Sequence, residues 1–412
     1  MTVGASWEEV TLEDHVDLVV GYAFKSSGYT DDESDVRLLR GDNVAQGELR
    51  WDKAKRWPVA DYQRYEPFHL REGDIILAMD RPWISAGLKY ARVKRKDTPS
   101  LLVQRVARLR GTESLKTDYL RCVIGSADFT DYVLSILTGV NIPHISAKDI
   151  KRFRFLLPPV ATQERISRVI TSYDDLIDNN TRRIEILEEM ARRLYEEWFV
   201  QFRFPGHERV EFKESELGLI PEGWAVTELE EVVHLTMGQS PSSEFYNEVG
   251  EGLPFHQGVT GFGDYFPSNK SYCTIEARVA NEGDILFSVR APVGRINVAK
   301  EKIVIGRGVS ALRSKTDHQI FLLSQLRCIF KEEDSMGNGA IFKTVTKKDM
   351  QSIKLLQPSA EVIGRFELIA APLWRLIRIL SDKNTNLSKQ RDLLLPKLIS
   401  GEIDVSDIPM PT

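Results

Sequence analysis

The sequence is poor in the features that metal sites, disulfide frameworks and membrane spans require. Its 412 residues include only three cysteines, Cys122, Cys273 and Cys328, which lie too far apart for the close pairs of a zinc site. No apolar run approaches the roughly 18 residues of a membrane-spanning helix. The acidic N-terminal segment also lacks the basic flank of a signal peptide. Because so few thiols are typical of a reducing compartment, we expect a cytoplasmic protein with neither a membrane nor a metal partner.

Catalytic motifs are missing as well. The seven histidines include no HxxxH or HExxH spacing, and the sequence has neither a Walker A nor a GxSxG motif. The segment "GVTGFGD" (258–264) departs from the GxGxxG spacing of dinucleotide-binding loops, so its glycines predict turns. "LLPPV" (156–160) lacks the Asn or Asp that precedes the prolines in amino-methyltransferase motifs. We therefore predict that the chain is not an enzyme, has no catalytic residue and binds no cofactor.

The charge balance excludes a protein that is basic over its whole surface. The 55 Lys and Arg residues are outnumbered by 60 Asp and Glu residues, which gives a net charge of −5. Local basic faces remain compatible with this balance, and such faces attract nucleic acid. With 42% hydrophobic residues over its 412 positions, the chain can form two or three globular domains.

The most informative feature that is present is an internal duplication. "HISAKDIKRFRFLLP" (144–158) returns as "TVTKKDMQSIKLLQP" (344–358) at an offset of 200, and "REGDIILA" (71–78) returns as "NEGDILFS" (281–288) at an offset of 210. Nearer the N-terminus the offset is 217, and Trp7, Leu12, Val16 and Gly21 match Trp224, Leu229, Val233 and Gly238. An offset that shrinks along the chain indicates loops of different length on one shared scaffold.

The repeated segment predicts the same local structure in both copies. Ser146 and Thr346 each stand three residues before an aspartate, Asp149 or Asp349, as at the start of a short capped helix. Alternating polar and apolar residues then predict a strand, which Pro158 ends in the first copy. Each half is therefore expected to contain a module of mixed α and β structure with many short strands.

A long heptad pattern follows each module. From Ile166 to Trp198, apolar or small residues recur at alternating steps of three and four, which predicts a helix with a coiled-coil seam and a length of about 60 Å. Residues 205–223 then predict a connecting loop. Solvated outer faces are indicated by oppositely charged residues four positions apart, namely Asp178 and Arg182, Glu188 and Arg192, and Glu189 and Arg193.

The second heptad pattern, from Phe366 to Leu398, is less regular. Pro372 removes one helical hydrogen bond, and we expect a break or kink near Ala371. Pro396 is expected to end or bend the last turns of this helix.

Each seam contains one asparagine, Asn180 in the first helix and Asn384 in the second. If the helices pack antiparallel with these amides facing each other, paired residue numbers sum to 564, and Ile184 faces Leu380. This arrangement maps onto itself under the 200-residue offset, as a pseudo-two-fold axis requires. The predicted seam consists of Ile177, Asn180, Ile184, Leu187, Ala191, Leu194, Leu373, Ile377, Leu380, Asn384 and Leu387.

Two corresponding stretches carry local positive charge. Residues 87–110 hold eight Lys or Arg against one Asp, and residues 290–315 hold seven against one Glu. Such cations can neutralise phosphates, while Arg, Asn and Gln read base edges; a solvated strand face is the alternative interpretation. The candidate DNA-binding residues are Lys25, Ser27, Tyr29, Arg81, Lys89, Arg92, Lys94, Gln239, Ser240, Gln257, Arg290 and Arg295.

These patterns predict an α+β protein in which two duplicated mixed α/β domains are separated by an antiparallel two-helix coiled coil with pseudo-two-fold symmetry. The expected boundaries are 1–157 for the first domain, 158–204 for the central helix, 205–357 for the second domain with its entry loop, 358–402 for the C-terminal helix and 403–412 for a tail.

At these segments the chain resembles the DNA specificity (S) subunits of type I restriction-modification systems, along essentially its full length. The resemblance is carried, in this order, by "LPPVATQERISRVI" (157–170), "LEEMARRLYEEWFVQF" (187–202), "GLIPEGW" (218–224), "NEGDILFSVRAPVGR" (281–295) and "QRDLLLPKLISGEIDV" (390–405).

The resemblance implies two target recognition domains, each of which reads one half of a bipartite, asymmetric site in double-stranded DNA. It also implies that the paired helices set the spacer and dock two methyltransferase (M) subunits, which hold S-adenosylmethionine and methylate adenine. Restriction (R) subunits then join for cleavage. The alternative is a coiled-coil structural adaptor without sequence-specific DNA reading.

Overall fold

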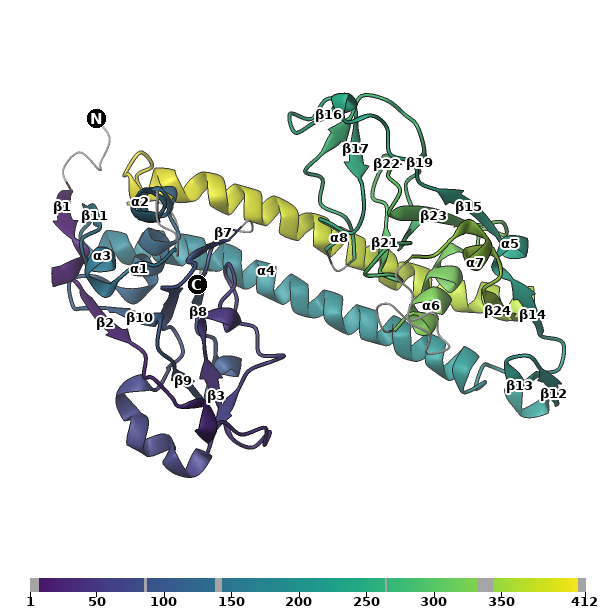
Figure 1. The fold of residues 1–412 in the computed structure, drawn as a ribbon, viewed down its shortest axis with the longest axis horizontal. Helices are drawn as coiled ribbons and strands as arrows, with labels where there is room; N and C mark the ends of the chain where they lie inside the picture. Colours follow the sequence, from purple (N-terminus) through teal and green to yellow (C-terminus); the bar gives the residue numbers. More distant parts are fainter. Residues whose placement is uncertain (1–6, 85–86, 138–142, 264, 332–343, 407–412) are drawn as a thin grey trace. The chain divides into compact units, whose positions relative to one another are not determined.

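The computed structural model describes residues 7–84, 87–137, 143–263, 265–331 and 344–406 (Figure 1). It contains two compact units: unit 1 comprises residues 1–179 and 383–412, and unit 2 comprises residues 180–382. The unit boundaries fall inside two long helices, α4 (Val160–Tyr195) and α8 (Ala360–Ile399), so each helix has one part in unit 1 and the other part in unit 2. Among the helices described, none combines the length and the apolar character that crossing a membrane requires.

Each unit contains a four-stranded antiparallel sheet of the same topology. In unit 1 the strand order is β2 (Val16–Val20), β10 (Val106–Gly111), β5 (Ile75–Ala78) and β8 (Tyr90–Arg92). In unit 2 it is β15 (Val233–Met237), β23 (Val309–Ser314), β20 (Ile285–Ser288) and β21 (Ile296–Val298). The two "EGDI" segments thus lie at matching strands, β5 and β20.

The strand registers are also repeated. β1 (Glu8–Thr11) pairs with β11 (Arg154–Leu157), and β14 (Ala225–Glu228) pairs with β24 (Lys354–Gln357). Glu8 lies opposite Leu157, and Ala225 lies opposite Gln357. Glu8 and Ala225 are 217 positions apart, and Leu157 and Gln357 are 200 positions apart, which are the two offsets read from the sequence. A shift by one residue would turn the buried side chains of these strands to the solvent. The predicted duplication is therefore confirmed at the level of individual residue pairs.

A second, smaller sheet in each unit contains one parallel pair. In unit 1 it consists of β4 (Arg56–Trp57), β3 (Val36–Leu39) and β9 (Ser100–Leu102), and β3 and β9 are parallel. In unit 2 it consists of β16 (Tyr246–Asn247), β18 (Tyr272–Cys273), β17 (Leu253–His256), β22 (Ile303–Ile305) and β19 (Val279–Ala280), and β17 and β22 are parallel. Unit 1 also has the hairpin β6 (Trp83–Ile84) and β7 (Gly87–Leu88).

Short helices complete the modules. They are α1 (Thr117–Ile124), α2 (Ala127–Leu137) and α3 (Ala147–Lys151) in unit 1, and α5 (Leu229–Val232), α6 (Gln319–Ile329) and α7 (Lys347–Gln351) in unit 2. The predicted capped helices are confirmed, because the Ser146 and Thr346 hydroxyls accept from the backbone N–H groups of Asp149 and Asp349. Each aspartate in turn accepts from its capping residue, which lowers the pKa of both carboxyls.

Two predictions about local structure are wrong. Residues 205–223 were expected to be a loop, but they include a hairpin of β12 (Phe212–Ser215) and β13 (Gly218–Pro221), which turns at Gly218 with φ 90°. Pro372 was expected to break the second helix, but α8 is continuous. Pro372 and Leu368 both lie on the exposed face of α8, where water can satisfy the carbonyl that the proline leaves without its usual donor.

The long helices run antiparallel within each unit (Figure 1). In unit 1, Arg391 of α8 donates to Asp174 of α4 at 2.7 Å, and the Asn384 amide donates to the Ile177 carbonyl at 3.3 Å. In unit 2, a buried cluster combines seam residues from both helices, namely Ile184, Ile377 and Leu380, and the partly buried Leu187 packs against it. Asn180 and Asn384 belong to different units, so their pairing stays a prediction.

The predicted ion pairs on the outer faces of α4 are confirmed only in part. Arg193 donates to Glu189 at 2.5 Å, as expected for a pair four residues apart. Asp178, however, accepts from Lys94 of the first module, and Glu188 accepts from Arg327 of the second. These carboxylates therefore connect α4 to the modules.

Candidate nucleic-acid interface

One end of the main sheet in unit 1 presents exposed polar and aromatic side chains at matching strand ends. Two backbone hydrogen bonds join the ends of β2 and β5 to the start of β10. Gly21 N–H donates to Val106 O at 3.0 Å, and Met79 N–H donates to Arg105 O at 2.9 Å. We call the exposed residues at this end the strand-end surface of module 1: Tyr22, Arg81, Trp83, Gln104 and Arg105.

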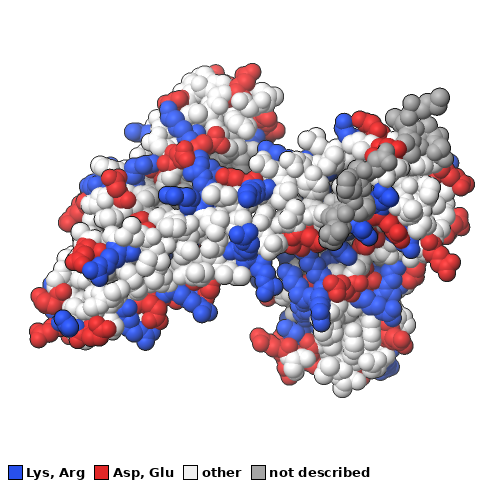
Figure 2. Space-filling view, turned by 180° about the vertical axis from the view of Figure 1, so that it is seen from behind, with Lys and Arg blue, Asp and Glu red and all other residues white. Residues whose placement is uncertain are grey.

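Unit 2 builds the equivalent surface with the same backbone hydrogen bonds. Gly238 N–H donates to Val309 O at 3.0 Å, and Val289 N–H donates to Gly308 O at 3.0 Å. The strand-end surface of module 2 comprises Gln239, Ser240, Gln257, Arg290 and Arg307. In the view of Figure 2, Lys and Arg side chains gather densely over unit 1 (lower right), with some Asp and Glu among them.

Two glycines at equivalent positions allow this close approach of the strand ends. A Cβ atom on Gly21 would lie 2.3 Å from the carbonyl oxygen of Val103, and one on Gly238 would lie 2.2 Å from that of Gly306. Real Cβ atoms do not come this close to backbone atoms, so neither position accepts a side chain without displacement of the neighbouring loop. The match of Gly21 with Gly238 in the sequence therefore has a steric cause.

Four of the five candidate residues from the second module lie on the strand-end surface. The Ser240 hydroxyl donates to the Gln257 side-chain oxygen at 3.0 Å and accepts from the Arg307 backbone N–H at 3.1 Å. Gln239 and Arg290 are exposed beside them. Arg295 is different, because it lines a cavity of about 640 Å³ together with Trp374 of α8.

The candidates from the first module are more dispersed. Lys25 and Ser27 are exposed at a short 3-10 turn, and the Tyr29 hydroxyl donates to the Phe24 carbonyl at 3.4 Å. Arg81 is exposed and has a φ of 43°, which holds the chain in a sharp turn before the β6–β7 hairpin. Lys89 is half-buried, and burial lowers the pKa of its ammonium group.

Several cations of the two basic stretches are engaged inside the protein. Arg92 pairs with Asp118 at 3.2 Å, and Lys94 pairs with Asp178 of α4. The aspartates of the "EGDI" segments hold arginines on the sheet: Arg110 donates to Asp74 at 2.9 Å, and Arg313 donates to Asp284 at 2.6 Å. The hydrogen bond with Asp74 raises the pKa of Arg110. The repeated motif thus has a structural role.

The sequence interpretation did not single out Trp83, Arg105 or Arg307. Trp83, in strand β6, is 39% exposed, whereas the residue that matches it at an offset of 210, Val293, is fully buried. Arg105 and Arg307 were noted only as members of basic stretches. Within the described ranges, no group of three or more metal-binding side chains occurs.

The fold is thus a duplicated module on a pair of long helices, with an exposed and divergent surface at the strand ends of each copy. The profile of the type I restriction modification DNA specificity domain matches residues 5–189 and 221–387. The chain belongs to this family of specificity subunits and carries its domain twice.

Individual relatives agree with this assignment. The chain is 35% identical over 271 residues to the specificity subunit ascribed to the MjaX type I restriction enzyme of Methanocaldococcus jannaschii, a match that spans 65% of this chain and 63% of the relative. It is 36% identical over 174 residues to the EcoAI specificity subunit of Escherichia coli, over 42% and 28% of the two chains. The type I S subunit from M. genitalium has a similar fold, with a TM-score of 0.58, 15% identity and coverage of 96% of both chains.

Proposed function

We propose that the chain reads a bipartite, asymmetric sequence in double-stranded DNA, with one half-site for each module. The observation that carries this proposal is one fold repeated with two different strand-end surfaces. Tyr22 and Gln104 of module 1 stand at the positions of Gln239 and Arg307 in module 2, as the shared strand registers indicate. Because base readout depends on the side chain that reaches the groove, two such surfaces favour two unlike half-sites.

In module 2, Gln257 and Arg290 are the strongest candidates for base contacts. A glutamine amide suits the edge of adenine and an arginine suits guanine. Ser240 restrains the Gln257 side chain by its hydrogen bond of 3.0 Å, which lowers the entropy lost when the amide meets a base. We expect the flanking cations to contact phosphates and to make the affinity dependent on salt.

The long helices are proposed to dock two methyltransferase subunits. They expose large apolar side chains outside the seam: Leu176, Ile186 and Met190 on α4, and Leu368, Ile369, Ile379 and Leu393 on α8. Large exposed apolar patches mark protein interaction sites, and we propose that these side chains form such patches. The chain itself is proposed to be non-catalytic and cytoplasmic, with S-adenosylmethionine and adenine methylation on the methyltransferase subunits, and restriction subunits joining for cleavage.

Selection from a fully randomised duplex library tests the proposed function. The full chain is used alone and together with a methyltransferase partner. We expect enrichment of two unlike half-sites at one fixed separation, more strongly with the partner, because the net charge of −5 disfavours binding by this chain alone. Failure to enrich any sequence in either sample would support the structural adaptor instead.

Substitutions in module 2 separate base contacts from phosphate contacts. We expect Arg290→Ala to change only the second half-site, at a cost of about 1–3 kcal/mol for the lost base contact. Arg365→Ala is the control, because this exposed residue of α8 pairs within the helix with Glu361. An equal loss of affinity for every sequence would mark the altered arginine as a phosphate contact.

The helices are proposed to set the spacer. Inserting one heptad into both α4 and α8 at the boundary between the units, after residues 179 and 382, keeps the antiparallel pairing in register. We expect a changed spacer and two unchanged half-sites. A changed half-site with the original spacer would contradict this role.

A further inference from the structure

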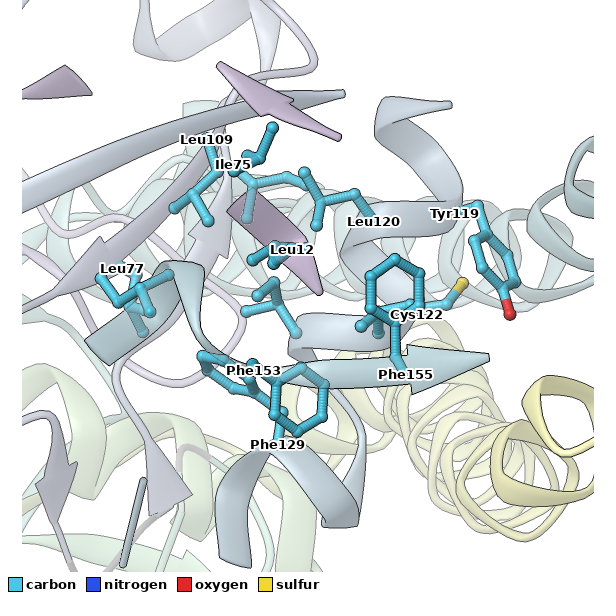
Figure 3. Close-up of a cluster of buried hydrophobic side chains, with 14 of the residues drawn as sticks. Leu12, Ile75, Leu77, Leu109, Tyr119, Leu120, Cys122, Phe129, Phe153 and Phe155 are labelled. Atoms are coloured by element: carbon cyan, nitrogen blue, oxygen red, sulfur yellow. The ribbon is translucent and has the colours of Figure 1, made fainter. Parts of the chain in front are cut away.

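Each module inserts one arginine against the long helices, and the two arginines come from a repeated sequence. "LRC" occurs at 120–122 in α1 and at 326–328 in α6. Figure 3 shows Leu120 and Cys122 among the buried side chains of the unit 1 core. The arginine between them, Arg121, has a side chain that is only 15% exposed. The Arg327 side chain is 21% exposed.

In unit 1, Arg121 joins three elements. Its guanidinium donates to the Asp174 carboxylate of α4 and, at 3.1 Å, to the Thr171 hydroxyl one turn earlier. The second oxygen of Asp174 accepts from Arg391 of α8 at 2.7 Å. A single carboxylate therefore connects the module to both helices.

In unit 2, Arg327 makes the equivalent connection with different chemistry. It donates to Glu188 of α4, and its guanidinium lies over the Trp374 ring of α8, 4.7 Å from the ring centre. Trp374 is the residue that matches Asp174 at the 200-residue offset. The Tyr265 hydroxyl of the module also donates to Glu188, at 2.6 Å. Asp174 thus binds the arginine of module 1 by an ion pair, whereas the matching residue Trp374 binds the arginine of module 2 by a cation–π contact.

We propose that Arg121 and Arg327 are positioning residues that fix the angle of each module on the helix pair and thereby limit the DNA spacer to one length. This inference rests on the proposed function. A module of roughly 150 residues has a radius of gyration of about 15 Å. A rotation of about 13° therefore moves a point at this distance from the axis by about 3.4 Å, which is the rise of one base pair along the DNA.

Module 1 also meets the start of α4 at Gln163, whose buried amide donates to the Ser114 carbonyl at 2.8 Å and accepts from the Lys116 backbone N–H at 2.9 Å. Further along the helices, the contacts other than Arg121 are less directional. Ile166 and Ile170 of α4 and Leu398 of α8 pack into the module core, and apolar packing of this kind tolerates small rotations. The Lys94–Asp178 pair is about half exposed, where an ion pair contributes little. A planar guanidinium with several partners permits only a narrow range of angles.

The test is selection from the randomised duplex library by the full chain with its methyltransferase partner. The variants are Arg121→Met and Arg327→Met, which keep most of the side-chain volume and remove the fork of donors. We expect both half-sites to be retained, while discrimination against a spacer one base pair too long or too short falls by about ten-fold or more. Arg121→Lys and Arg327→Lys are expected to give intermediate discrimination.

The control is Arg192→Met, because Arg192 pairs with Glu189 of α4 and with Glu196 just after it, and we expect this variant to leave the spacer unchanged. Thermal unfolding shows which variants fold. If a methionine variant does not fold, the lysine variant at the same position is used in its place. Wild-type spacer discrimination in the folded variants overturns the proposal, as does a change in the half-sites themselves. A wild-type chain that enriches no bipartite sequence contradicts the proposed function instead.

Discussion

Asp174 of α4 accepts hydrogen bonds from two arginines, Arg121 of α1 and Arg391 of α8. Its side chain is 22% exposed, so the two cations face a largely desolvated carboxylate. Loss of this carboxylate leaves both guanidinium groups without their shared partner, and leaving buried charge uncompensated is more costly than the pair is stabilising.

We expect Asp174→Ala to destabilise unit 1 by about 3 kcal/mol. Hydrogen exchange of the backbone amides in α1 and in the first half of α4 measures the loss. Asp392→Ala is the matched control, because Asp392 also pairs with Arg391 but is 64% exposed, and we expect no measurable change. Equal effects of the two substitutions would contradict the importance of burial.

The equivalent glycines provide a second prediction. Gly21→Ala and Gly238→Ala place a methyl group against a backbone carbonyl, and overpacking of this kind costs about 1–3 kcal/mol. Each substitution is expected to weaken only the half-site of its own module, as measured by selection on randomised duplexes. Gly41→Ala is the control, since no atom lies within 4 Å of the added carbon. Unchanged recognition in the Gly21 variant would show that the strand ends do not shape the reading surface.

The exposed side chain of Trp83 leads us to predict a base contact in module 1 that module 2 lacks, because the matching residue Val293 is buried. Its side chain is 39% exposed, and apolar side chains in the major groove contact the thymine methyl group; loss of a specific base contact costs about 1–3 kcal/mol. We expect Trp83→Ala to weaken the first half-site by this amount and Trp83→Phe to retain part of the contact. Val59→Ala controls for the loss of exposed apolar surface, because Val59 is 56% exposed in the same module. An effect on the second half-site would contradict this prediction.

His256 predicts a pH dependence of the stability of unit 2. Its imidazole is 3% exposed, and burial lowers its pKa below the usual 6.5. The unfolded chain therefore takes up a proton first as the pH falls, so stability is level above about pH 6.5 and declines below it. Urea unfolding as a function of pH measures this slope.

Substitution of His256 provides the check. His256→Leu, which inserts the residue found at the matching position Leu39 of module 1, is expected to abolish the slope. His234→Gln is the control, because His234 is exposed and is expected to leave the slope unchanged. A slope that persists in the His256→Leu variant would assign the pH dependence to another group.

The elements whose structure depends on local sequence were predictable. The capped helices at Ser146 and Thr346 and the strands that follow them depend on residues within a few positions of one another. The duplication was equally predictable, because both copies kept the apolar positions that set the strand registers. Pro372 was misjudged because its effect depends on whether the face it occupies is exposed, and this is a property of the packed helix pair.

Contacts between elements far apart in the chain were not predictable from spacing. Glu188 and Asp178 stand four residues before an arginine, yet each pairs with a cation of a module. The role of Arg121 and Arg327 was signalled only by the short "LRC" repeat, which lies outside the motifs that carry the family resemblance. Individual base-contacting residues remain predictions, because a divergent surface has no repeat to identify it.

The division of the chain between the two units has a consequence for its synthesis. Unit 2 is continuous in sequence, whereas the core of unit 1 includes Leu398 and Val405 from the last part of the chain. A ribosome therefore delivers every residue of unit 2 before it delivers the segment that completes unit 1. Module 1, which is translated first, is thus the last to finish folding, and we expect premature termination near residue 390 to damage unit 1 while leaving unit 2 intact.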